Sequence, residues 1–207
     1  MAAFRLALIA GFVAFMSATA SAAPTEETIL FVRHGEKPAA GLGQLNCQGL
    51  NRALALPAVV LARFGQPDFV FASNPGDKKM DGPEAYNYIR PLLTVAPTAV
   101  QLGLPVNTSF GYDDIAGLQR ELLSPAYRSA RILVGWEHHQ LKSLVRKMLT
   151  DLGADANAVP DWKGSDFDSL YMLTITRDDS STTARFALAK EQLNGQSTAC
   201  PLPLPKP

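Results

Sequence analysis

The clearest absence in the sequence is an excess of charge of either sign. Its 207 residues hold 19 Lys and Arg against 19 Asp and Glu, so the formal net charge is zero. Proteins that bind nucleic acid or an anionic membrane through their overall field carry a basic patch or stripe, and the sequence contains none. We therefore expect no nucleic-acid partner and no membrane partner for the mature chain. A bound anion must be held by a few placed side chains.

Long apolar runs are also scarce. The most marked run, residues 6–16, is well short of the roughly 20 apolar residues that a spanning helix needs. Arg5 precedes this run, and the small residues Ala20-Ser21-Ala22 follow it in the form that signal peptidase accepts. We interpret residues 1–22 as a signal peptide, with an uncleaved membrane anchor as the alternative. The mature protein is then expected in the periplasm or outside the cell.

Cysteine occurs only at Cys47 and Cys200. Two cysteines in an exported chain have one pairing available, and an oxidising compartment favours it. We expect an intramolecular Cys47–Cys200 disulfide that ties the C-terminal tail to the first helical region; two unrelated buried thiols are the alternative. A catalytic thiol is not expected, because nothing in the sequence places a base beside either cysteine.

No repeat or linker divides the mature chain, and the only low-complexity segment is the proline-rich end, residues 201–207. Hydrophobic residues make up 47% and charged residues 18% of the chain, which is typical of a globular rather than a disordered protein. A chain of this length suits one domain with a sizeable core. We therefore expect a single domain over residues 23–207.

Strand-like and helix-like segments alternate along this domain. The pattern predicts strands at 28–32, 68–72 and 132–135, helices at 46–64, from residue 91, at 118–123 and at 141–152, and a loop around residues 74–82. Pro57 is expected to kink or split the first helix. Residues 170–176 and 182–188 predict a terminal hairpin. This order predicts an α/β three-layer sandwich with a mostly parallel central sheet and a C-terminal β-hairpin.

Polar segments follow the three predicted strands. They are Arg33-His34-Gly35 after the first strand, the Ser73 loop after the second, and Trp136-Glu137-His138-His139 after the third. In open α/β sheets the ligand lies beyond the carboxyl ends of the strands, so we expect these segments to meet. Arg90 stands directly before Pro91 and is therefore expected at a helix N-terminus, where an anion is favoured.

These residue types suit phosphoryl transfer. Arg33 and Arg90 can offer planar forks of donors to the oxygens of a phosphoryl group. The neutral imidazole of His34 can attack phosphorus and form a labile phosphohistidine, and His138 can donate to the developing charge. A zinc site at residues 137–139 is a weaker alternative, because consecutive side chains are expected to point in different directions and the sequence has no zinc-protease motif or cysteine cluster.

Several segments together resemble the histidine phosphatase superfamily, also called the phosphoglycerate mutase-like superfamily. The similar segments are Ile29–Lys37 with its nucleophile loop, Leu45–Ala53 with a helix start like L-S/T-x-x-G-x-x-R-A, Arg90 and Thr94 in an R-x-x-x-T pattern, and Ile132–His138 with a second histidine. The Trp136-Glu137 pair before that histidine is similar to a less-studied subgroup. The resemblance covers about residues 28–176.

The resemblance implies that His34 is the nucleophile and that Arg33, Arg90 and His138 complete a phosphate pocket. It does not supply a proton donor, because the family's acidic positions have no clear match here. By proximity alone, Glu137 and His139 are candidates, and an orienting role is favoured for Glu137.

Two cationic features have ordinary structural explanations as well. A structural ion pair with Glu84 or Asp81 is the alternative for Arg90. Lys78 and Lys79 are expected to be solvated loop charges, although they could also guide an anionic substrate.

The function predicted from these observations is metal-independent hydrolysis of a small phosphorylated substrate, a phosphomonoester or phosphoanhydride, through a phosphohistidine, with no cofactor. The alternatives are a mutase-like phosphotransferase, a protein phosphohistidine phosphatase, and a catalytically silent protein that only binds an anion.

Overall fold

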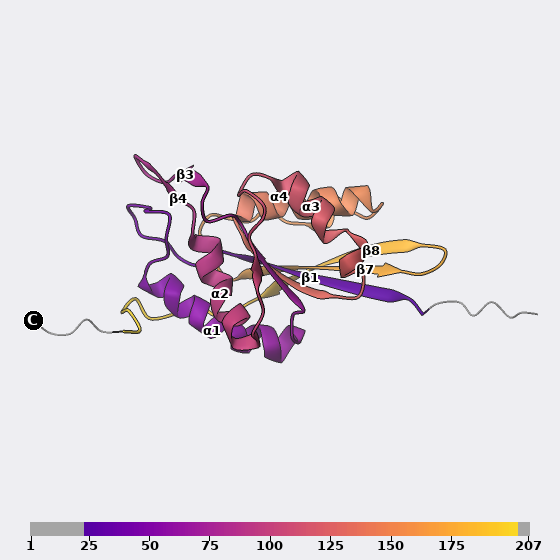
Figure 1. Ribbon diagram of the computed structural model, residues 1–207, viewed down its shortest axis with the longest axis horizontal. Coiled ribbons are helices and arrows are strands. Elements are labelled where there is room, and N and C mark those ends of the chain that lie inside the picture. The colour runs from indigo at the N-terminus through magenta and orange to yellow at the C-terminus, as the bar shows by residue number, and fades with distance from the viewer. Residues whose placement is uncertain (1–22, 203–207) are drawn as a thin grey trace, which may run out of the picture.

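The computed structural model describes residues 23–202 of the chain. The expected signal peptide, residues 1–22, lies outside the described residues, and so do residues 203–207. The elements follow in the order β1 (Thr25–Arg33), α1 (Cys47–Phe64), β2 (Phe69–Ala72), β3 (Lys78–Met80), β4 (Ala85–Asn87), α2 (Arg90–Leu102), β5 (Val106–Asn107), α3 (Ile115–Leu122), η1 (Pro125–Tyr127), β6 (Arg131–Trp136), α4 (His138–Asp151), η2 (Ala156–Ala158), β7 (Ser169–Arg177) and β8 (Thr182–Lys190) (Figure 1).

The main sheet has six strands in the order β5-β2-β6-β1-β7-β8. The pairs β5–β2, β2–β6 and β6–β1 are parallel, whereas β1–β7 and β7–β8 are antiparallel. The last two strands form the expected C-terminal hairpin. The predicted fold class, an α/β protein with a mostly parallel central sheet, is confirmed.

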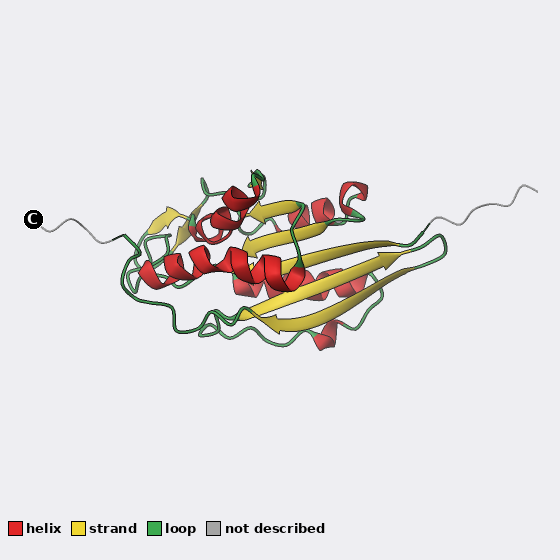
Figure 2. Ribbon diagram, turned by 90° about the horizontal axis from the view of Figure 1, so that it is seen from below, coloured by secondary structure: helices red, strands yellow, loops and turns green. Residues whose placement is uncertain are grey.

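Helices cover both faces of this sheet. Helices α1 and α2 lie on one face, seen in front of the strands in Figure 2, and α3 and α4 lie on the other (Figure 1). Successive side chains of β1 point to opposite faces: Ile29 and Phe31 pack with α3 and α4, and Leu30 and Val32 pack with α1 and α2. All four are buried, which explains why this strand reads as a continuous apolar run.

Helix α1 begins where the sequence predicts. The side chain of Asn46 caps it by accepting from the N–H of Gly49 over 2.8 Å, and the helix ends at Gly65, whose φ is 82°. The helix is not split at Pro57. The neighbouring side chains Leu56 and Val60 are fully buried, and this packing offsets the hydrogen bond that proline cannot donate.

Residues 74–82 are not a simple loop, as the sequence pattern suggested. They contain strand β3, which pairs with β4 in a short antiparallel hairpin, with Lys79 opposite Tyr86. Three-residue strands of mostly polar composition fall below the length at which alternation can be recognised. The hairpin projects at the end of the molecule where β1 and β6 finish (Figure 1).

The expected disulfide between Cys47 and Cys200 is present, and it joins residues 153 positions apart in sequence. The side-chain amide of Asn51 also donates to the carbonyls of Ser197 and Ala199, each over 2.8 Å. The C-terminal segment is thereby fixed to the first two turns of α1. Within residues 23–202, no helix combines the length and apolar character needed to cross a membrane.

Candidate active site

The parallel pairing of β1 with β6 brings two distant segments of the chain together. Arg33 lies opposite Trp136 in the register, and the N–H of His34 donates to the carbonyl of Trp136 over 2.9 Å. His34-Gly35 and Glu137-His138 therefore leave the sheet side by side. The topology of the sheet, rather than closeness in sequence, creates this meeting point.

A cavity of about 150 Å³ lies at these strand ends. It is lined by Arg33, His34, Lys37, Lys79, Met80, Asp81, Tyr88, Arg90, Glu137 and His138. All five side chains predicted as site residues are in this set. The structure also adds a second group that the sequence did not single out as site residues, most of it contributed by β3 and the residues around it.

His34 is 3% exposed, and its Nδ1 lies 2.8 Å from the carbonyl oxygen of Gly35. A carbonyl oxygen can only accept, so Nδ1 carries the proton and Nε2 keeps its lone pair. Burial, with a further contribution from the charge of Arg90, lowers the pKa of His34 to about 3. The imidazole is therefore neutral at physiological pH, which is the state that a nucleophile requires.

The loop after His34 is held from two sides. The N–H of Gly35 donates to Oγ1 of Thr94 over 2.9 Å, and that hydroxyl donates to the carbonyl of Arg90 over 2.9 Å. On the other side, a Cβ atom at Gly35 would lie 2.9 Å from the carbonyl oxygen of Gly49. Only a glycine lets the loop approach the start of α1 this closely.

A buried ion cluster anchors the next residue of the loop. Nη2 of Arg52, a fully buried residue of α1, lies 2.7 Å from Oε1 of Glu36. Nη1 of the same guanidinium lies 2.8 Å from Oε2 of Glu191, just after β8. Arg52 thereby joins the nucleophile loop to the C-terminal segment through two charge-assisted contacts.

Arg33 is positioned by a loop that the sequence analysis missed. Its Nη1 donates to the carbonyls of Gly164 and Asp166 over 2.8 and 2.9 Å, and its guanidinium stacks on Phe167 at 3.8 Å from the ring centroid. Burial lowers the pKa of Arg33 to about 10, so the group stays cationic at neutral pH. Its Nε is buried and has no partner among the described residues.

Arg90 forms the ion pair with Asp81 that was the structural alternative for this residue. Asp81 also binds Nζ of Lys37 at 2.6 Å and accepts from the N–H of Gly43 over 3.1 Å. Burial opposes ionisation of Asp81, but its bonds to Lys37 and Arg90 lower its pKa to about 2. Arg90 nevertheless lines the cavity, and its Nε is buried without a partner among the described residues.

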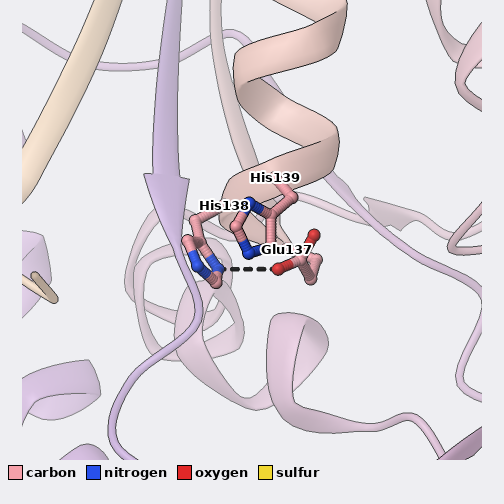
Figure 3. Close-up of side chains that lie close together, drawn as sticks. All are labelled: Glu137, His138 and His139. Atoms are coloured by element: carbon pink, nitrogen blue, oxygen red, sulfur yellow. Dashed lines mark ion pairs between the residues drawn. The ribbon is translucent and has the colours of Figure 1, made fainter. Parts of the chain in front are cut away.

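Glu137 orients His138 (Figure 3). Oε1 of Glu137 lies 2.6 Å from Nδ1 of His138, and Oε2 accepts from the N–H of Gln140 over 3.0 Å. Burial opposes ionisation, but these two interactions lower the pKa of Glu137 to about 2. Glu137 is therefore ionised at neutral pH. Nε2 of His138 is buried with no partner among the described residues, and it can donate to a bound anion when the ring carries both protons, one of them directed at Glu137.

Comparison of the sequence with protein-family models and with curated proteins gives no match. Comparison of the structure does. A protein from Nakamurella multipartitia, named for the phosphohistidine phosphatase SixA, is 16% identical with a TM-score of 0.50, over 82% of this chain and 98% of that one. A mycobacterial glucosyl-3-phosphoglycerate phosphatase, solved with inorganic phosphate, is 16% identical with a TM-score of 0.51, over 78% and 95%. The chain shares their fold.

From the sequence we expected the side chains of residues 137–139 to point in different directions, which argued against a zinc site. In the structure they converge. Glu137, His138 and His139 bring ligand atoms within 4.8 Å of one another, and the two imidazoles lie 4.0 Å apart (Figure 3). The reason is that Glu137 caps α4 and folds its carboxylate back over the first turn. These three residues could hold a cation, with His139 exposed and the other two buried.

Sequence reasoning also misplaced Lys79. It was expected to be solvated like Lys78, but it lines the cavity, with Nζ 4.8 Å from the ring centroid of Tyr88 and 5.0 Å from that of Tyr112. Lys78 and Met80, on the other face of β3, are exposed. The alternation of a strand separates the two lysines, but it is informative only once β3 is known to be a strand.

Proposed function

We propose that the protein is a metal-independent phosphatase of the histidine phosphatase type, which hydrolyses a phosphomonoester or phosphoanhydride through a phosphohistidine on His34. The observation that carries this proposal is the buried, neutral imidazole with a fixed Nδ1–H tautomer, in one small cavity with two guanidinium groups. The two phosphatases that share the fold support it. We also propose that residues 1–22 direct export and that residues 23–207 form the mature domain.

The proposed first step is in-line attack by Nε2 of His34 on phosphorus. The N–P bond forms as the bond from phosphorus to the leaving oxygen breaks, and the electron pair stays on that oxygen. Arg33, Arg90 and His138 balance the charge on the other phosphoryl oxygens. The carbonyl of Gly35 accepts from Nδ1–H and stabilises the positive charge of the phosphorylated ring.

Water completes the proposed reaction. Water attacks phosphorus and gives up a proton to the solvent, the N–P bond breaks, and the electron pair of that bond returns to Nε2 while inorganic phosphate leaves. Neither Glu137 nor Asp81 holds a proton at neutral pH, so neither can protonate the leaving oxygen. We therefore assign Glu137 the role of orienting His138, and we expect esters of acidic alcohols, such as aryl phosphates, to react faster than alkyl phosphates.

A second candidate is an anion-binding protein without turnover. The ionised state of both cavity carboxylates favours it, because neither carboxylate can then protonate the leaving group of a bound ester.

Hydrolysis of p-nitrophenyl phosphate in the presence of a chelator tests these alternatives. We expect turnover by the wild type and a loss on the order of a thousand-fold or more in His34→Ala. An alkaline quench followed by intact mass measurement should detect a phosphorylated wild-type chain and none in His34→Ala, whose folding is checked by thermal denaturation. Phosphate binding without turnover at any pH would instead establish the anion-binding function. Turnover abolished by the chelator would assign the chemistry to a metal at residues 137–139.

A further inference from the structure

Lys79 is the one ammonium group of the cavity lining that the described residues leave without an ion pair. The other lysine of the cavity, Lys37, is paired with Asp81. The ammonium of Lys79 lies instead beside the paired rings of Tyr88 and Tyr112, 4.8 and 5.0 Å from their centroids. Aromatic faces attract a cation but do not neutralise it.

The carboxylates near Lys79 are already occupied. Asp81 is shared by Lys37 and Arg90, and Glu137 is bound to His138 and the start of α4. Burial lowers the pKa of Lys79; the charge of Glu137 opposes this shift, and the charge of Arg90 adds to it. An anionic group bound beside Lys79 would offset the cost of keeping its ammonium charged in this partly buried position.

The position of Lys79 in the cavity indicates which part of a substrate it meets. His34, Arg90 and His138 are buried and we take them as the floor of the cavity, whereas Lys79 is half-buried and its neighbour Met80 is 63% exposed, which places β3 on the solvent side of the cavity. In-line attack directs the leaving group away from the nucleophile. With His34 on the floor, the leaving group must point toward the opening, past β3.

The size of the cavity also indicates that the phosphoryl group lies on the floor and the leaving group near the opening. About 150 Å³ accommodates a phosphoryl group and little more, so the rest of the substrate extends beyond the floor. From these observations we propose that Lys79 binds a second acidic group, a carboxylate or a second phosphate, on the leaving-group portion of the substrate. This inference rests on the proposed phosphatase function. It makes Lys79 a specificity-determining residue and the preferred substrates acidic phosphoesters.

Three aryl phosphates that differ only in a distal group test the proposal: 4-(carboxymethyl)phenyl phosphate, 4-(phosphonomethyl)phenyl phosphate and the neutral 4-(carbamoylmethyl)phenyl phosphate. We expect the wild type to prefer one or both acidic esters over the amide by about ten-fold or more in kcat/KM, the size of one charge-assisted contact. The acidic ester with the larger kcat/KM relative to the amide shows whether Lys79 favours a carboxylate or a second phosphate.

The variants are Lys79→Met, Lys79→Arg and the matched control Lys78→Met on the exposed face of the same strand. We expect Lys79→Met to abolish the preference for the acidic esters, Lys79→Arg to retain most of it, and Lys78→Met to behave as the wild type. The proposal is overturned if the wild type shows no preference, or if Lys79→Met slows the acidic and neutral esters equally, because Lys79 would then serve the transferred phosphoryl group.

A binding measurement keeps this test separate from the question of turnover. Calorimetry with 4-(carboxymethyl)benzylphosphonate and its neutral amide reports the preference without any hydrolysis. If the wild type cleaves no ester but binds the acid more tightly than the amide in a Lys79-dependent way, the phosphatase function fails and the second anion subsite stands. If it cleaves the esters but neither measurement depends on Lys79, the subsite fails and the phosphatase function stands.

Discussion

The N–H of Gly35 donates to the hydroxyl of Thr94 over 2.9 Å, across 59 positions of sequence. Thr94 is fully buried, and its hydroxyl also donates to the carbonyl of Arg90. One oxygen atom therefore links the loop that holds the proposed nucleophile to the helix that presents the second arginine.

Replacing this hydroxyl should disturb both partners at once. In Thr94→Val the shape is kept, but the N–H of Gly35 loses its acceptor inside the protein. We expect the free energy of unfolding to fall by about 1–3 kcal/mol and kcat to fall more than KM changes, because the imidazole is no longer held. Thr94→Ser keeps the hydroxyl and should recover most of the activity. Equal activity of the valine and serine variants, measured with p-nitrophenyl phosphate, would refute the positioning role.

The protonation state of His34 can be observed directly by nitrogen-detected NMR, since the chain has only three histidines. We expect its ring to remain the neutral Nδ1–H tautomer until the pH approaches 3. His34→Gln assigns the signals. A ring that gains its second proton near pH 6 would contradict the structure.

The lowered pKa of His34 also makes the free energy of unfolding depend on pH in a defined direction. The unfolded chain takes up a proton on this residue below its ordinary pKa of 6.5, but the folded chain does not until about pH 3. The free energy of unfolding should therefore decrease as the pH falls through this window. Chemical denaturation of wild type and His34→Gln at several pH values checks this, because the variant should lose that part of the slope.

Glu137→Gln distinguishes an orienting carboxylate from a proton donor. If Glu137 orients His138, the variant should lose roughly ten-fold or more in kcat/KM to a similar extent for p-nitrophenyl and phenyl phosphate. A proton donor would matter much more for phenyl phosphate, whose leaving group is the poorer one. A loss confined to that ester would restore Glu137 as the acid.

Removal of the disulfide should affect stability more than chemistry. Closing a loop of 153 positions is worth about 5 kcal/mol in the chain-entropy account. We expect the double variant Cys47→Ser with Cys200→Ser to unfold at much lower denaturant concentration and, while folded, to keep most of its kcat. An unchanged unfolding midpoint would show that Asn51 and its neighbours fix the tail without the covalent bond.

The fold was predictable because its main strands carry strong local signals. The fully buried runs of β1 and β6 and the hairpin β7–β8 each show a pattern that depends on their own residues. The β3–β4 hairpin has no such pattern, since its strands are short, polar and stabilised by their pairing with each other. The same limit hid the inward position of Lys79.

The sequence predicted which residues line the candidate site, but it did not predict which of them contact each other or which other residues position them. Strand ends placed His34, Glu137 and His138 together, as expected for an open α/β sheet. The stacking of Phe167 on Arg33 joins residues 134 positions apart and has no counterpart in local sequence. The choice of Asp81 over Glu84 as partner of Arg90 depends likewise on the hairpin geometry.

The contact of Arg52 with both Glu36 and Glu191 has a consequence for the order of events in folding. Glu191 follows the last strand of the sheet, so a chain that ends before it already contains every side chain of the cavity but lacks one of the three carboxylates that pair with this guanidinium. The full set of contacts around Arg52 can therefore form only once residue 191 has been added to the chain. A truncated product that ends before residue 191 would carry every cavity side chain but would lose the tie that Arg52 makes between the nucleophile loop and the C-terminal segment.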